Sequence, residues 1–157
     1  MLDYQIVNDH DRHSINDDVF EFWKKHNVLD EKKAKKRLNE VIGIVKSQNK
    51  LCGVCTAREA YLNDFQAHLD FVRRYLKTQN VGFRFLSFFN KFMHHIEENS
   101  ELLYPQSIGI FLAVQNRKLN NKWKEAICSK TGFIYLGNFK KDYQMRVKYF
   151  KNSRLTH

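Results

Sequence analysis

The sequence has little proline, few cysteines and no long apolar run, and each shortage excludes a class of protein. It holds one proline in 157 residues and no stretch rich in glycine and serine, so we expect one domain without a linker, over residues 1–157. No apolar run approaches the roughly 20 residues of a membrane span. The N-terminus also lacks the basic and apolar segments of a signal peptide. We therefore expect a soluble, cytoplasmic protein without a membrane partner.

The three cysteines, Cys52, Cys55 and Cys128, fit free thiols in a reducing compartment better than a disulfide framework, because their number is odd. Cys52 and Cys55 have C-x-x-C spacing, which also occurs in zinc and redox sites. Residues three apart in a strand point to opposite faces, however, and no second cysteine pair follows. The sequence therefore predicts no metal site.

Charge is strongly unbalanced, with a formal net charge of +10 and a pI near 9.6. A field of this sign attracts polyanions, so nucleic acid or a phosphate-bearing cofactor is a plausible partner. The densest basic run is residues 31–37, and others lie at Arg73 and Arg74, at Lys122 to Lys124 and after Lys140. Such runs are usually solvated helix faces, and only their convergence in space would indicate a binding patch.

The apolar periodicity predicts helices and strands along the whole chain, with a polar turn from Asn8 to Arg12. The expected helices run from Asn16 or Asp17 to about Asn27, from Asp30 through the basic run, from Phe85 to about Glu97, and from Asn120 or Asn121 through Ile127 to a stop at Gly132. The expected strands are residues 4–7, 41–45, 51–56, 65–71, 108–114, 133–136 and 143–150, with a hairpin turn at residues 46–50. The strand at 65–71 alternates apolar and polar residues, which predicts one buried and one polar face. The sum is a mixed α/β domain in the order β-α-α-β-β-β-α-β-α-β-β.

The most informative stretch is Thr78 to Phe89, where a polar turn leads directly into an apolar helix. The N-terminus of a helix offers free backbone N–H groups and the positive end of the dipole, so it suits a phosphate or pyrophosphate. Gly82 lets the backbone approach such a group without a Cβ in the way. On local grounds alone, an ordinary turn before a buried helix explains the same residues.

This order of elements, together with the turn Gln79-Asn80-Val81-Gly82-Phe83-Arg84, resembles the GCN5-related N-acetyltransferase (GNAT) superfamily. Its members carry a Q/R-x-x-G-x-G/A turn at the same joint. The resemblance implies a GNAT-like acyl-CoA N-acyltransferase fold and a turn whose backbone holds the pyrophosphate of acetyl-coenzyme A. Arg84 stands where the family has a small residue. Its guanidinium either adds a cation for the phosphate or crowds the turn.

A second part of the resemblance lies near the C-terminus, where Asn116 and Gly132-Phe133 are similar to the family's N…GF signature. The fourth residue before this glycine is commonly a tyrosine that protonates the leaving thiolate, and here it is Cys128. The strand end before the turn would pair its backbone with the pantetheine arm. The residues that the resemblance assigns to the cofactor are Phe71, Val72, Arg73, Arg74, Gln79, Asn80, Val81, Gly82, Phe83, Arg84 and Asn116.

Acetyl transfer also needs a group that accepts the proton of the acceptor amine. His68 and Asp70 lie two residues apart on the polar face of the predicted strand 65–71. The imidazole of His68 is the candidate base, and Asp70 would raise its basicity or orient the amine. The alternative is a face packed under the first two helices with both side chains simply hydrogen-bonded. For Cys128, a thiol donor and a small core residue are both open.

Two functions follow from these observations. The first is an acyl-CoA-dependent N-acyltransferase that transfers an acetyl group directly to an amine, with an anionic acceptor such as nucleic acid favoured by the charge. The second is a GNAT-fold protein that has lost catalysis and binds nucleic acid or a protein partner. The resemblance also makes a homodimer a possible assembly, because family members are often dimers, but the sequence does not determine the oligomeric state.

Overall fold

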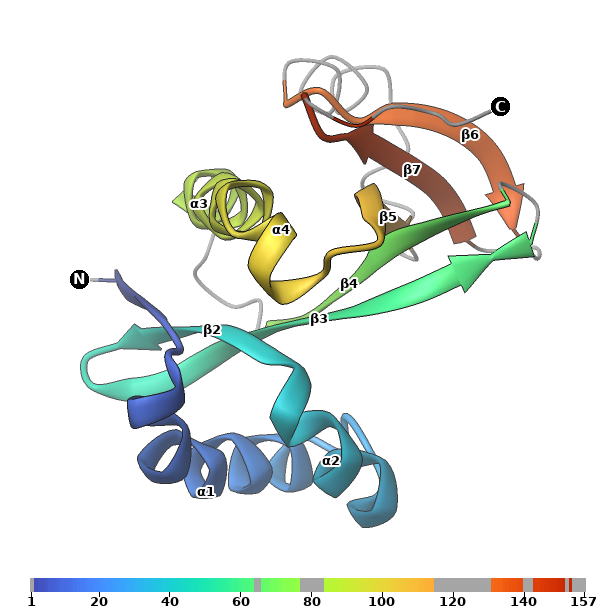
Figure 1. The fold of residues 1–157 in the computed structure, drawn as a ribbon. Coiled ribbons are helices and arrows are strands. Elements are labelled where there is room, and N and C mark those ends of the chain that lie inside the picture. The colour runs from blue at the N-terminus through green and yellow to red at the C-terminus, as the bar shows by residue number, and fades with distance from the viewer. Residues whose placement is uncertain are drawn as a thin grey trace. The chain divides into compact units, whose positions relative to one another are not determined.

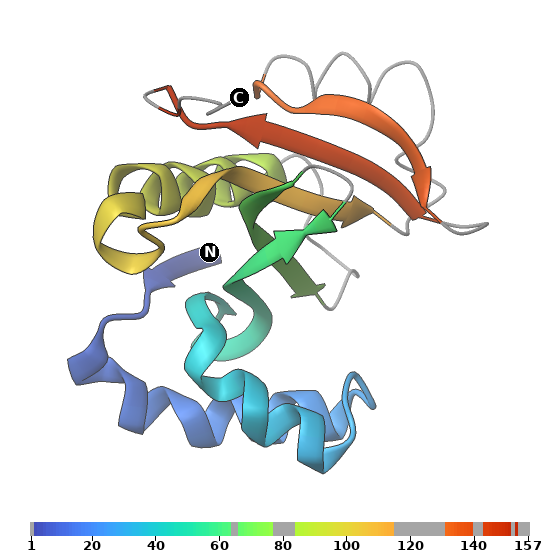
Figure 2. The same cartoon turned by 45° about the vertical axis from the view of Figure 1, so that its right-hand side comes forward.

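The computed structural model describes residues 2–63, 66–76, 84–114, 131–139, 143–151 and 153. Over these residues the helical elements are α1 (Asp9–Lys25), α2 (Glu31–Arg37), the 3₁₀ turn η1 (Leu38–Glu40), α3 (Arg84–Glu98) and α4 (Ser100–Leu103). The strands are β1 (Leu2–Ile6), β2 (Val41–Ser47), β3 (Lys50–Leu62), β4 (Ala67–Leu76), β5 (Ser107–Val114), β6 (Ile134–Phe139) and β7 (Tyr143–Tyr149) (Figure 1, Figure 2).

The described strands form one mixed sheet in the order β1-β2-β3-β4-β5-β7-β6. β4 and β5 pair in parallel, whereas β1 with β2, β2 with β3, β5 with β7 and β6 with β7 are antiparallel. Parallel neighbours need a crossover connection, and here α3 and α4 lie between β4 and β5 in the chain. The predicted mixed α/β fold class is therefore confirmed.

Several elements lie where their sequence pattern predicts them. Asp30 caps α2, because its carboxylate accepts from the backbone N–H of Lys33 at 2.9 Å. The hairpin between β2 and β3 turns at Gln48 and Asn49, whose φ values of 49° and 60° suit a tight two-residue turn. The apolar spacing from Phe85 onward corresponds to α3.

Some predicted element boundaries were wrong, and one helix was not predicted. The stretch from Asn8 to Arg12 is not a turn, because α1 already begins at Asp9. Acidic residues in its first turn, Asp9 and Asp11, are favourable at the positive end of the helix dipole. β3 extends to Leu62 rather than ending at residue 56, and the short helix α4 was not expected. The expected helix at 120–127 lies outside the described residues.

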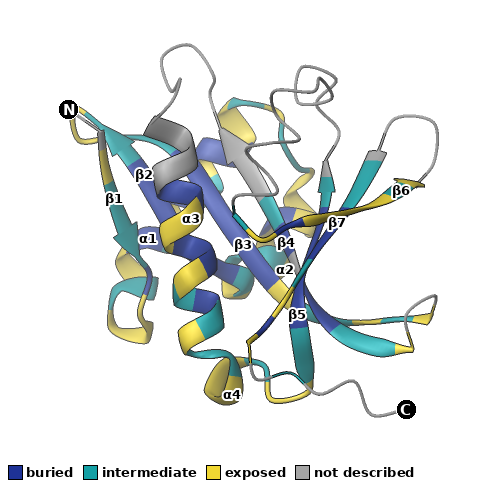
Figure 3. Ribbon diagram, turned by 90° about the horizontal axis from the view of Figure 1, so that it is seen from above, coloured by how far each residue is buried: buried dark blue, intermediate teal, exposed yellow. Residues whose placement is uncertain are grey.

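The chain divides into two compact units, the first formed by residues 1–57 and 73–92. In this unit α1 and α2 lie side by side (Figure 1). Their apolar faces meet β2 and β3 in a core that includes Val19, Trp23, Ile44 and Val54. Figure 3 shows the buried middle of β3 in dark blue. Gly43 points to the other face of β2, where its Cα lies against the ring of Phe92 in α3.

The second unit comprises residues 58–72 and 93–157. Leu69, Phe111 and Val147 form a buried cluster on one face of β4, β5 and β7. The opposite face carries Asp70 and its register partner Ile110, which is in turn paired with a lysine of β7. Strand β4 is therefore buried on both faces at this point, and the predicted polar face was wrong here, because Leu69 and Asp70 are each 0% exposed.

None of the helices in the described part of the chain combines the length and the apolar character that crossing a membrane requires.

Candidate functional site

Polar side chains from three neighbouring strands gather in the second unit. Glu59 comes from β3, His68 and Asp70 come from β4, and Ser107 is the first residue of β5. Two contacts connect them in pairs, one between Glu59 and His68 and the other between Asp70 and Ser107. Neither Glu59 nor Ser107 was a candidate from the sequence.

His68 is held by the carboxylate of Glu59, with 3.3 Å between Nδ1 and Oε1. The other oxygen of Glu59 accepts from the backbone N–H of Gln106 at 3.3 Å, and the ring of Tyr61 packs edge-on against the imidazole with 5.1 Å between centroids. These contacts fix the carboxylate and one face of the ring. When the Nδ1–H donates to Glu59, Nε2 is the nitrogen that can accept a proton. The His68 side chain is 34% exposed, so this nitrogen belongs to a partly accessible group.

Asp70 differs from His68 in being completely buried. Its Oδ1 accepts from the hydroxyl of Ser107 at 2.5 Å, whereas its Oδ2 has no hydrogen-bond partner among the described residues. Burial raises the pKa of Asp70 to about 7, the Ser107 hydrogen bond opposes this rise, and the charge of Glu59 adds to it. Near neutral pH this buried carboxyl group is therefore partly protonated.

The carboxylate that orients His68 is thus not the expected one. Asp70 and His68 lie on the same strand, but Asp70 is bound to Ser107 and the histidine is bound to Glu59. Asp70 fits the alternative of a packed and hydrogen-bonded side chain, whereas His68 remains partly exposed. The catalytic roles of both residues stay predictions.

The predicted cofactor strand, Phe71 to Arg74, lies in β4. Its first two residues are register partners of Phe111 and Leu112 in β5, and the Val72 side chain is buried. In the first unit, Arg73 lies near Glu40, with 3.8 Å between Nη1 and Oε2.

The helix after the predicted phosphate turn begins where the sequence places it, since the described part of α3 starts at Arg84. The side chain of Arg84 lies outside what the structure describes. Whether its guanidinium adds a cation for the phosphate or crowds the turn therefore stays a prediction with two alternatives. The other predicted site residues outside the described chain are Gln79, Asn80, Val81, Gly82, Phe83, Asn116 and Cys128.

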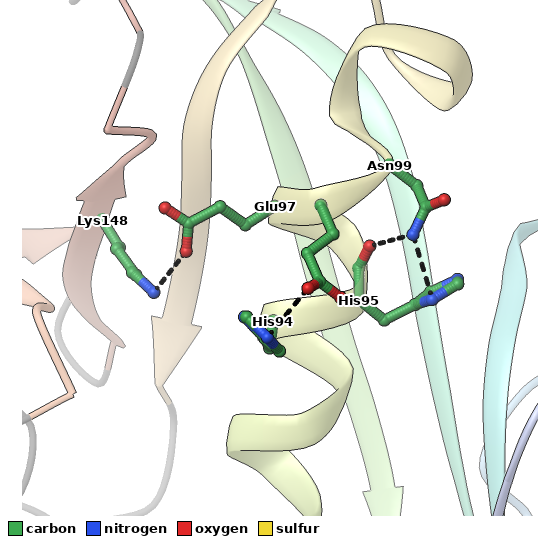
Figure 4. Close-up of polar contacts among 6 residues, drawn as sticks. His94, His95, Glu97, Asn99 and Lys148 are labelled. Carbon is green, nitrogen blue, oxygen red and sulfur yellow. Dashed lines mark hydrogen bonds and ion pairs between the residues drawn. The ribbon is translucent and has the colours of Figure 1, made fainter.

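Two adjacent histidines near the end of α3 point to different partners, as Figure 4 shows. His94 Nε2 lies 3.0 Å from Glu98 Oε1, one turn further along the helix. His95 Nδ1 lies 3.2 Å from the side-chain nitrogen of Asn99. Burial lowers the pKa of His95, although the charge of Glu98 opposes this. The two imidazole rings therefore contact different residues and do not form one joint site.

The cysteines of β3 have contacts of their own within the first unit. Cys55 is buried, and Cys52 donates from Sγ to the carbonyl oxygen of Val45 at 3.3 Å. Burial raises the pKa of the Cys52 thiol, which disfavours the thiolate that a metal would require. Within the described ranges no three His, Cys, Asp or Glu side chains are grouped as a metal site would need.

A weak signal in the sequence pointed to Glu59. The residues after Thr56 continue to alternate, and Ala57, Glu59 and Tyr61 fall on one face of a longer strand. Charged residues in this stretch obscured that pattern. The contact with His68 further depends on the pairing of β3 with β4, which no local pattern specifies.

Comparison with known proteins gave no match to a family profile and none to a curated sequence. Solved structures did match. A GNAT-family acetyltransferase from Streptococcus pneumoniae superposes with a TM-score of 0.59 and 12% identity, over 96% of this chain and 99% of that one. The chain has the GNAT fold.

Further matches agree with this assignment. The ribosomal-protein-S5-alanine acetyltransferase from Vibrio fischeri gives a TM-score of 0.59 at 14% identity, over 98% of this chain and 96% of that one. N-acetylglutamate synthase from Neisseria gonorrhoeae, solved with coenzyme A and N-acetyl-glutamate, gives 0.56 at 10% identity, over 97% of this chain and 36% of that one. The predicted GNAT resemblance is therefore confirmed for the fold, whereas the activity is a separate question.

Proposed function

We propose that the chain is an acyl-CoA-dependent N-acyltransferase that transfers an acetyl group directly to an amine. The observation that carries this proposal is the His68–Glu59 pair, which joins β4 to β3 in a fold found in solved acetyltransferases. A partly exposed imidazole with one nitrogen held by a carboxylate is suited to accept a proton at the other. Fold similarity alone would be a weaker basis, because one fold hosts many functions.

The chemistry requires a proton acceptor and a proton donor. The acyl-CoA thioester supplies the acyl carbon, which the amine nitrogen attacks so that an N–C bond forms and the C–S bond breaks. Nε2 of His68 takes the proton that the amine loses. The leaving sulfur needs a proton in return, and Cys128 is the predicted donor by its position before Gly132. Asp70 is buried and hydrogen-bonded to Ser107. We therefore propose that Asp70 supports the site from within the sheet and does not itself contact the reacting groups.

The start of α3 supports coenzyme A as the acyl carrier. This 15-residue helix begins at Arg84, directly after the predicted turn with Gly82. The first four N–H groups of a helix lack partners within the helix, and the dipole is positive at this end. Residues 79–84 are therefore the ones that would hold the pyrophosphate.

A second candidate function is binding without catalysis. The net charge of +10 and the arginine at position 84 favour it, because both suit contact with a polyanion irrespective of any transfer step. Steep salt-dependent retention on heparin together with no affinity for acetyl-coenzyme A would select this function.

Incubation with radiolabelled acetyl-coenzyme A and a cell extract tests the transferase directly. After separation into protein, nucleic-acid and small-molecule fractions, we expect acid-stable label in one fraction and matching release of the free coenzyme A thiol. The His68→Ala protein is the control and should transfer far less. No label in any fraction and no thiol release from wild type would contradict the proposal.

A further inference from the structure

Six exposed lysines converge where α1 ends and α2 begins. We call Lys24, Lys25, Lys32, Lys33, Lys35 and Lys36 the basic corner. Asp30 and Glu31 lie among these lysines, and Glu21 lies one helical turn before Lys24 and Lys25. The run at residues 31–37 is therefore part of a larger positive surface on the first unit, to which the end of α1 also contributes.

Contacts between the two helices show that the lysines share one region. The charge of Lys24 in α1 reaches Glu31 at the start of α2 and helps to lower the pKa of that carboxyl group, after the hydrogen bond and charge of Lys35. Nζ of Lys35 also lies 6.0 Å from the ring centroid of Phe20 in α1. The lysines at the end of α1 and those of α2 thus lie in one region of the surface. The sequence alone does not show this proximity.

Helix stabilisation explains only part of this charge. Lys33 pairs with Asp30 at 2.7 Å and Lys35 pairs with Glu31 at 2.6 Å. Within the described residues, Lys25, Lys32 and Lys36 form no ion pair. On the helical wheel, Lys32 and Lys36 lie almost opposite the buried Ala34, so they project away from the core. Uncompensated charges on an outward face repel each other unless an anion lies between them.

The chemistry of the surface distinguishes among polyanions. Membrane-binding helices also expose large apolar side chains, but the large exposed apolar residues of the described chain include none from α1 or α2. Lysines act as mobile point charges, which suits a regular row of phosphates. We propose that the basic corner binds the phosphate backbone of a nucleic acid. The binding of nucleic acid to this surface does not depend on catalysis. That the bound nucleic acid is also the acceptor of the acyl group rests on the proposed function.

Fluorescence anisotropy with a labelled, mixed-sequence single-stranded RNA, without any acyl-CoA, tests this surface. The variant is Lys32→Gln/Lys36→Gln. The matched control is Lys46→Gln/Lys50→Gln, which removes the same charge at the hairpin, at the other end of β2 from α2. Glutamine has nearly the helix propensity of lysine, and circular dichroism checks that both variants fold.

Each lost phosphate contact on a single strand lowers the salt dependence of log K by about 0.7, so we expect the α2 variant to lower it by about 1.4. Over a fourfold rise in salt, wild type would then lose about sevenfold more affinity than this variant. The hairpin control should keep the wild-type salt dependence. Equal losses in both variants, no RNA binding by wild type at low salt, or equally tight binding to poly-glutamate or to anionic phospholipid vesicles would each overturn the assignment. Because the readout contains no acyl-CoA, its failure would leave the transferase proposal untouched.

Discussion

Oε1 of Glu59 lies 3.3 Å from Nδ1 of His68, so a carboxylate on β3 holds the imidazole of the neighbouring strand. A backbone N–H from Gln106 fixes the second oxygen of the same carboxylate. The imidazole therefore has one nitrogen bound within the sheet and another that is available. Such a pair is useful to an enzyme that must remove a proton from an amine, and it has clear consequences for mutation.

Replacing His68 by Gln should lower turnover by about 100-fold or more, because a positioned general base typically contributes that much. Affinity for acetyl-coenzyme A should remain close to that of wild type, since the role proposed for the imidazole is toward the amine rather than the pyrophosphate. Glu59→Gln should lower turnover less, because the ring stays in place and loses only its charged partner. Steady-state kinetics with a separate cofactor titration provides the measurement. Unchanged turnover in His68→Gln would remove this residue from the mechanism.

Asp70 should make the protein less stable as the pH rises. Its pKa is raised from 3.8 to about 7 in the folded chain. Between these values the folded state keeps a proton that the unfolded state releases, so the free energy of unfolding falls with pH across this window. The full difference corresponds to about 4 kcal/mol. Urea denaturation from pH 4 to pH 8 should show this loss relative to Asp70→Asn, which has no carboxyl group to titrate. Parallel curves for the two proteins would show that Asp70 does not titrate in this range.

The ion pair between Lys148 of β7 and Glu97 of α3 should stabilise the second unit. Nζ lies 2.8 Å from Oε2, and Oε1 of Glu97 has no hydrogen-bond partner among the described residues (Figure 4). Lys148→Met would leave this largely buried carboxylate without its cation, so we expect a loss of about 1–3 kcal/mol at pH 7. Lys151→Met, which removes a nearby exposed charge, should cost less.

The same pair should also depend on pH. Burial alone would raise the pKa of Glu97, but Lys148 and Lys151 together lower it below 4.5. The contribution of the pair is therefore present above this value and is lost as the pH falls through the folded-state pKa. The difference between wild type and Lys148→Met should shrink in acid, and a difference that stays constant down to pH 3 would show that the lysine acts through packing.

Gly43 should tolerate no side chain while Phe92 is present. A Cβ built at this position would lie 2.2 Å from Cε1 of the Phe92 ring. We expect Gly43→Ala to destabilise the protein by about 1–3 kcal/mol, because the ring or the strand must move. In a Phe92→Leu background the same substitution should cost less, and a double-mutant cycle measures this coupling. Additive effects would mean that the two residues do not compete for the same space.

Strong apolar periodicity predicted the elements that pack against the sheet. The spacing from Phe85 through Ile96 corresponds to α3, and the continuous run from Ile108 corresponds to β5. Polar segments were harder to assign. The beginning of α1 has mostly polar residues that face solvent, and the end of β3 carries charged side chains, so neither shows an apolar stripe.

The candidate site was only half predictable for a related reason. His68 has a recognisable chemistry and lies on a strand, which the sequence indicates. Its partner depends on which residue of β3 lies beside it, and the environment of Asp70 depends on how β5 pairs with β4. Register and packing result from the whole fold rather than from local pattern.

Isothermal titration with acetyl-coenzyme A tests the central claim most directly, with wild type, Gly82→Val and His68→Ala measured side by side. We predict saturable binding by wild type, weaker binding by Gly82→Val because the added side chain blocks the turn, and nearly wild-type binding by His68→Ala. Absence of binding by wild type at millimolar concentrations would contradict the account.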